Sequence, residues 1–152
     1  MNNGQVESAI RDYLANVIHM SLATCINNKP WVCEVHFVYD NELNVYWRSK
    51  QDSRHSQEIA QNPRVAGNIV EQYDMSDKPR GVYFEGAAEK LESVQIGDGV
   101  YELFAKRFGL GEEAIEEART DGGHKFYKVN VSDMYLFDSR ESSPSQKYML
   151  EC

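Results

Sequence analysis

The sequence predicts a mainly β fold, a small antiparallel barrel of six strands with helices at its periphery. The first observation behind this prediction is a series of six short segments rich in β-branched and aromatic residues, several of them joined by tight turns. The second is that helical patterns occur only before the first strand, in one short middle segment and in an insertion before the last strand. With 152 residues, the chain is long enough for one domain, spanning 1–152, with its own core.

The first element is an amphipathic helix over about residues 4–16. Apolar side chains recur there at helical spacing, so one face of the helix is expected to pack against the barrel. These side chains are Val6, Ile10, Tyr13, Leu14 and Val17. The barrel itself is expected to occupy about residues 15–140.

Three strands follow, over residues 19–26, 31–39 and 43–47. The first two are joined by Asn27-Asn28-Lys29-Pro30, which predicts a turn because Asn tolerates left-handed backbone angles and Pro restricts the chain. A second turn is expected at residues 40–42.

The rest of the chain alternates between short helices and long strands. A helix over residues 53–61 is closed by Asn62-Pro63, since proline just past a helix end is a normal stop signal. Further elements are expected as strands over 64–72, 80–91 and 125–137, and helices over 99–108 and 112–119. Residues 139–152 form a polar tail.

The composition excludes several classes of function. A formal net charge of −8 makes the chain a poor general ligand for nucleic acid or an anionic membrane. No apolar run approaches the ~18 residues that a membrane span needs. The first residues show no basic region followed by an apolar block, so we expect no secretory signal and a cytoplasmic protein.

The cysteines and histidines do not indicate metal or redox chemistry. Cys25, Cys33 and Cys152 fit a reducing compartment, and their spacing matches no zinc or redox motif. The histidines likewise lack metal-ligand spacing, so no metal site is expected. We interpret Cys25 and Cys33 as small apolar strand residues.

The segment 47–63, WRSKQDSRHSQEIAQNP, carries a local excess of positive charge in an acidic chain. Ser53 falls at the expected start of a helix, where free N–H groups and the helix dipole favour an anion. From the residues alone, the segment is either a phosphate site or a solvated turn with Asp52 or Ser53 as N-cap. Its cations and hydroxyls are Arg48, Ser49, Lys50, Ser53, Arg54 and His55.

This segment is similar to the FMN-phosphate segment of the pyridoxamine 5'-phosphate oxidase-like split-barrel family. In that family an aromatic strand is followed by Thr or Ser, then Ser-Arg-Lys, then Asn-Pro. Here Ser49, Ser53-Arg54 and Asn62-Pro63 fall at the matching spacing, with His55 in place of the lysine. Upstream, VCEVHFVYDNELNVYW resembles the hairpin that supports the flavin ring, and downstream RGVYFEGAAEKLE resembles the next long strand.

The resemblance implies a six-stranded split barrel of the FMN-binding type. It assigns the backbone of four strand residues to the isoalloxazine ring and five side chains to the phosphate and ribityl. The first group is Glu34, Val35, His36 and Phe37, and the second is Arg48, Ser49, Ser53, Arg54 and His55. It also implies a homodimer with the cofactor at the interface, so that each site borrows residues from the partner.

The expected activity is that of an FMN-dependent oxidoreductase acting on a small molecule, with substrate and catalytic residues unidentified. It is not that of a true pyridoxamine phosphate oxidase, because Gly81 stands where those enzymes carry a flavin-contacting glutamine. Of their substrate-phosphate segment, residues 101–113 keep Arg107 but lack the proline and serine. The alternatives are a non-catalytic module binding flavin, haem or a deazaflavin, and a structural dimer without cofactor. His36 is either a flavin or substrate contact or a half-buried strand residue.

Overall fold

The computed structural model describes residues 1–141 and 145–148. The described helices are α1 (Asn3–Asn16), α2 (Arg54–Gln61), α3 (Gly99–Phe108) and α4 (Glu113–Ala118). The described strands are β1 (His19–Ile26), β2 (Lys29–His36), β3 (Val38–Tyr39), β4 (Val45–Lys50), β5 (Arg64–Val70), β6 (Arg80–Leu91), β7 (His124–Asp138) and β8 (Ser145–Tyr148).

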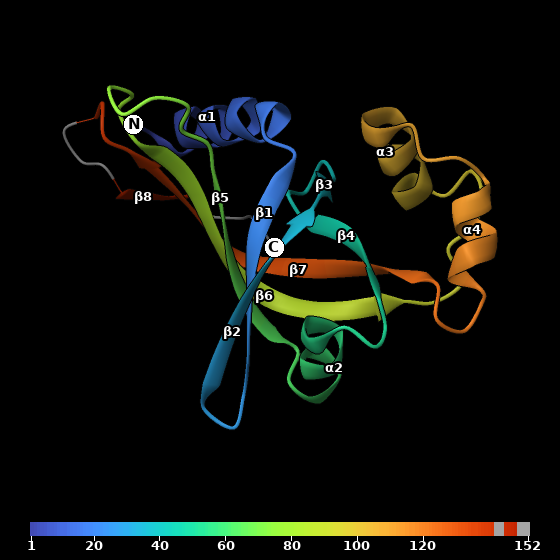
Figure 1. Ribbon diagram of the computed structural model, residues 1–152. Helices are drawn as coiled ribbons and strands as arrows, with labels where there is room; N and C mark the ends of the chain where they lie inside the picture. Colours follow the sequence, from blue (N-terminus) through green and yellow to red (C-terminus); the bar gives the residue numbers. More distant parts are fainter. Residues whose placement is uncertain (142–144, 149–152) are drawn as a thin grey trace.

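The strands form one antiparallel sheet in the order β2-β1-β5-β6-β7-β4-β3, with β8 added beside β7. The sheet curls on itself, and helices lie around it (Figure 1). The predicted fold class, mainly β with a curled antiparallel barrel-like sheet, is therefore confirmed. The predicted number of six strands is corrected to eight among the described residues, because the strand expected over 31–39 is divided into β2 and β3 and the tail adds β8.

The hairpin between β1 and β2 follows directly from the sequence. Asn27 and Asn28 adopt positive φ angles of 50° and 60°, the conformation that a two-residue turn between twisted strands requires. This turn sets the register in which Ile26 pairs with Lys29 and His19 with His36. The predicted turn is confirmed.

The predicted strand over 31–39 is divided in two, and this division closes the sheet. β2 pairs with β1, whereas β3 pairs with β4 at the opposite end of the strand order. Between them lies Phe37, whose N–H donates to the carbonyl of Ile18 at 3.1 Å and whose ring is fully buried. The chain thus passes from one edge of the sheet to the other at Phe37, which brings the ends of β2 and β4 close together.

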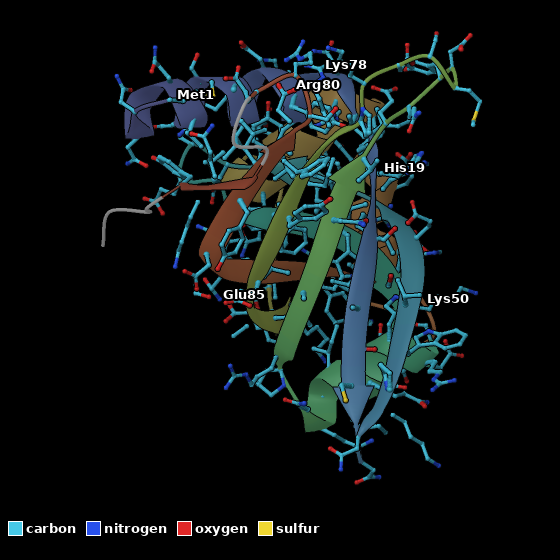
Figure 2. The ribbon with its side chains drawn as sticks, turned by 90° about the vertical axis from the view of Figure 1, so that its left-hand side faces the viewer. Met1, His19, Lys50, Lys78, Arg80 and Glu85 are labelled. Carbon is cyan, nitrogen blue, oxygen red and sulfur yellow. The ribbon has the colours of Figure 1, made fainter. Side chains whose placement is uncertain are left out.

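Two apolar clusters hold the molecule together. The larger one lies inside the curled sheet, where α1 contributes Val6, Ile10 and Leu14. Figure 2 shows α1 along one end of the sheet and α2 near the opposite end, beside the lower parts of β1 and β2. The smaller cluster joins α3 and α4 to the sheet, with Phe104 and Ile115 packed near Phe126. The helical insertion therefore has its own apolar base next to β4 and β7.

The polar tail differs from the expectation. Its described part includes β8, which pairs with β7 in a register that sets Tyr148 opposite Met134. The Tyr148 side chain is buried in the larger apolar cluster. β4 covers β7 only from His124 to Val129, so the far half of β7 keeps an open edge that β8 occupies.

Candidate functional site

An open pocket of about 710 Å³ lies where β2, β4 and β7 approach the start of α2 and the end of α3. This volume is within the range of small-molecule sites. The lining residues are Glu34, Val35, His36, Arg48, Ser49, Lys50, Asp52, Ser53, His55, Phe104, Phe108, Leu110 and His124. A second hollow, of about 810 Å³, lies beyond α2 and has neither arginine nor histidine in its lining.

Most of the residues assigned from the sequence meet at this one pocket. Both the predicted ring segment and the predicted phosphate segment contribute to it, although they belong to different strands. Its lining includes the predicted residues Glu34, Val35, His36, Arg48, Ser49, Ser53 and His55. Phe37 and Arg54 lie outside the lining.

The Phe37 and Arg54 side chains contact residues outside the pocket lining. The Phe37 ring is in the main core, with the Arg107 guanidinium carbon 4.9 Å from its centre. Arg54 donates from Nε to Glu58 at 2.7 Å, and its guanidinium carbon lies 4.1 Å from the centre of the Trp31 ring. The Phe37 side chain is thus a core element, and Arg54 lies against the exposed face of β2.

A cluster of hydroxyl and imidazole groups forms the polar wall of the pocket. The Nε2 atom of His55 lies 2.7 Å from the Ser49 hydroxyl oxygen and 3.3 Å from that of Ser53. Burial lowers the pKa of His55, which favours the neutral form of this imidazole. Ser53 is the N-cap of α2, as its hydroxyl accepts from the backbone N–H of Ser56 at 3.4 Å. The N-cap interpretation and a phosphate site are compatible at this position.

Arg48 provides the charge at this wall. Its Nη2 donates to Glu117 at 2.9 Å, and its guanidinium carbon lies 5.3 Å from the centre of the Phe126 ring. Its Nε is buried and has no hydrogen-bond partner among the described residues. A buried donor without an acceptor is costly, so an oxygen-rich ligand at this point would satisfy it.

Sequence reasoning missed the pair formed by Glu117 and His124. The Nδ1 atom of His124 lies 2.6 Å from Glu117 Oε1, and the same oxygen accepts the backbone N–H of His124 at 3.1 Å. These bonds, with the donation from Arg48, lower the pKa of Glu117 to about 2. Glu117 therefore holds both Arg48 and His124 at the pocket. The acidic run around Glu117 was interpreted as a solvated helix face, and no local pattern separates this one glutamate from its neighbours.

The opposite wall is apolar and comes from the helical insertion. Phe104, Phe108 and Leu110 line it, and the Phe108 ring stacks on His36 at 5.3 Å between ring centres with 20° between planes. The His36 side chain is exposed, which corrects its alternative interpretation as a half-buried strand residue. The stack of Phe108 on His36 joins the helical insertion directly to the end of β2.

Arg107, which we compared with the substrate-phosphate segment of the oxidases, does not line the pocket. Its Nη2 donates to the carbonyls of Leu14, at 2.8 Å, and Val17 at the end of α1. Burial lowers the pKa of Arg107. Arg107 joins α3 to the C-terminal end of α1. It matches the arginine of the oxidases in sequence position, but its role in this protein is to hold two helices together.

Glu34, at the rim, is held by two residues of β1. His19 Nδ1 lies 2.8 Å from Glu34 Oε2, and the Ser21 hydroxyl donates to Oε1. Cys33, the residue before Glu34, is a free thiol, and burial raises its pKa to about 11. Cys25 on β1 is also a free thiol. Both cysteines are half-buried strand residues, whereas Cys152 lies outside the described residues.

No three His, Cys, Asp or Glu side chains of residues 1–141 and 145–148 gather closely enough to hold a metal ion. None of the described helices combines the length and apolarity needed to cross a membrane.

Comparison with known proteins gives a consistent fold. The family model described as pyridoxamine 5'-phosphate oxidase matches residues 6–138. A UPF0306 protein of Photorhabdus laumondii is 27% identical over 93 residues, which cover 60% of this chain and 65% of that protein. The match thus spans less than two thirds of the relative's length.

Solved structures resemble the chain in fold at low identity. ChuZ of Campylobacter jejuni matches with a TM-score of 0.76 and 19% identity, over 98% of this chain and 61% of that one. HutZ of Vibrio cholerae, described as a heme storage protein, matches with a TM-score of 0.70 and 18% identity, over 86% of this chain and 94% of that one.

Proposed function

The chain belongs to the pyridoxamine 5'-phosphate oxidase family, and from this premise we propose that it binds FMN in the pocket between β2, β4 and α2. The proposal includes an FMN-dependent oxidoreductase activity on a small molecule. The bound flavin would supply hydride or electron transfer, while the protein binds it, orients it and excludes water.

The observation that carries the proposal is the polar wall of the pocket. Ser49, Ser53 and His55 form one hydrogen-bonded cluster at the N-terminus of α2, and Arg48 brings a buried Nε without a partner among the described residues. Hydroxyls, a helix N-terminus and an arginine are the groups that bind phosphate oxygens. The residues present therefore fit the phosphate end of FMN.

The remainder of the pocket suits a flat aromatic ring system. Phe104, Phe108 and Leu110 offer an apolar wall, and Glu34 to His36 offer the β2 backbone on the other side. A tricyclic flavin has both a hydrophobic face and polar edges, which match such a pocket. The lining accounts for ring binding without identifying the substrate.

The substrate is proposed to differ from pyridoxamine phosphate. The proline and serine of the oxidases' substrate-phosphate segment are absent, and Arg107 is bonded to α1 carbonyls. No other arginine among the described residues takes its place next to the apolar wall; Arg48, across the pocket, is paired with Glu117.

A homodimer with the cofactor at its interface is part of the same proposal. β2 lies at one edge of the sheet order, and its Trp31 and Val32 are exposed apolar residues. An exposed apolar edge strand is a normal interaction surface. We expect roughly 2,000 Å² or more of total buried surface, because the interface would also wall the cofactor. Light scattering during dilution, with and without FMN, measures this: FMN should suppress dissociation, and a stable monomer that binds FMN tightly would contradict it.

Haem is the second candidate ligand. HutZ, which shares the fold, is described as a heme storage protein. In this chain, His36 and His124 both line the pocket, and imidazole is a common haem ligand.

For the location of the protein, the free thiols of Cys25 and Cys33 favour the cytoplasm.

One experiment separates these ligands. The absorption spectrum of protein purified without added cofactor should show two bands, at about 375 and 450 nm, where oxidised flavin absorbs. A single intense band at about 400 nm would support haem instead. Binding of FMN and riboflavin to the stripped protein then tests the phosphate wall, and equal affinity for the two would overturn the assignment.

A further inference from the structure

The Arg54 guanidinium contacts one group on its own helix, Glu58, and one on another strand, Trp31. Its Nε donates to Glu58 Oε2 at 2.7 Å, and its guanidinium carbon lies 4.1 Å from the centre of the Trp31 ring on β2. Glu58 is buried and fixed in turn by Thr24, whose hydroxyl donates to Oε1 at 2.9 Å. The orientation of Arg54 is therefore set by β1 and β2 as well as by α2.

These two contacts leave the two terminal nitrogens of the Arg54 guanidinium without a hydrogen-bond partner among the described residues. The Arg54 side chain is 50% exposed, so these nitrogens are open to a ligand. Arg54 follows the N-cap Ser53 directly, which places it at the same helix end as the polar wall of the pocket.

We propose that Trp31 is a positioning residue for the phosphate site, which with Glu58 holds Arg54 at the helix end that borders the pocket and leaves its two terminal nitrogens free to bind the phosphate of FMN. This inference rests on the proposed function and deepens it. An arginine whose fork is already oriented loses less side-chain entropy when it binds a phosphate. Because Trp31 carries no net charge, its ring can be removed without changing the net charge of the site.

The test measures dissociation constants of FMN and riboflavin for wild type, W31A and W31F. We expect W31A to weaken FMN binding by roughly 3- to 10-fold and riboflavin binding by less than about 2-fold. W31F keeps an aromatic face under Arg54, so it should retain most of the preference for FMN. The matched control is V70A, a truncation of an exposed apolar residue at the end of β5 and outside the pocket lining, which should leave both affinities unchanged.

A double-mutant cycle distinguishes positioning from direct contact. In an R54A background, W31A should have no further effect on the ratio of the two affinities, because the group that it positions is gone. If W31A weakens both ligands equally, or acts as strongly without Arg54, Trp31 contacts the ligand or the partner directly and the inference is wrong. If wild type binds FMN and riboflavin equally, the proposed function fails instead. If wild type prefers FMN and W31A keeps that preference, only the present inference fails.

Discussion

His55 Nε2 lies 2.7 Å from the hydroxyl oxygen of Ser49, and His55 stands at the sequence position where the family pattern has a lysine. Burial lowers the pKa of this imidazole. A phosphate bound beside it would raise the pKa, because an anion favours the charged form. The His55 contribution to binding should therefore be complete at pH below the pKa of the free protein, and should disappear above the pKa of the complex.

The H55K variant tests this pH dependence. A lysine stays charged throughout the range, so we expect FMN to bind about 10-fold more tightly at about pH 8, with a smaller gain at about pH 6. The phosphate of FMN titrates in the same range, and the ratio of the two proteins' affinities removes that effect. Riboflavin serves as the control ligand. An H55K protein that binds FMN no better at pH 8 would contradict the assignment of His55 to the phosphate.

Arg54 is expected to contribute directly to phosphate binding. R54A should weaken FMN binding by about 1.5–3 kcal/mol, the scale of a charge-assisted hydrogen bond, and leave riboflavin nearly unchanged. R64A makes the same charge change at an exposed position at the start of β5 and is the matched control. Isothermal titration calorimetry checks both. Equal effects of R54A and R64A would show that only the overall charge matters.

The Glu117 carboxylate on α4 should make the free energy of unfolding fall as the pH becomes acidic. Its pKa is about 2 in the folded protein and near 4.5 when unperturbed, so its stabilising contribution is complete above about pH 4.5 and is lost as the pH falls towards 2. E117Q should thus lower the free energy of unfolding at about pH 5 and make less difference at about pH 3. Urea denaturation at the two pH values measures this. E116Q, an exposed neighbour on α4, is the control, and an E117Q effect that grew on acidification would refute the linkage.

Arg107 is expected to matter for stability and not for the ligand. R107M removes the donor to the Leu14 and Val17 carbonyls at the end of α1. We expect a loss of about 1.5–3 kcal/mol, the scale of hydrogen bonds to a charged group, and a Tm lower by roughly 4–10 °C. R119M alters an exposed arginine of the same insertion and should leave Tm unchanged. A large loss of FMN affinity at normal Tm would instead place Arg107 in the site.

Pyridoxamine phosphate and pyridoxine phosphate are expected not to be substrates. The segment that would hold their phosphate is incomplete, and Arg107 is bonded to α1 carbonyls. An assay of pyridoxal phosphate formation by the FMN-loaded protein checks this. Turnover of ~1 s⁻¹, within the usual range for enzymes, would show that the protein does oxidise these phosphates and would contradict this expectation.

The sequence by itself determined the features that depend on a few neighbouring residues. The Asn27-Asn28 turn, the Ser53 cap and the Pro63 stop lie where the pattern predicts, because each depends on local backbone preferences. The meeting of Ser49 and His55 is also local, since a strand end and a helix start six residues apart must face each other.

Only the tertiary structure decided which distant groups complete the site. Glu117 reaches Arg48 across 69 residues of chain, and Phe108 stacks on His36 from the helical insertion. Arg54 lies beside the pocket lining and packs on Trp31, because a buried glutamate and an aromatic face hold it there. Such contacts leave no periodic trace in the sequence, because they arise from the packing of separate segments after the sheet has curled.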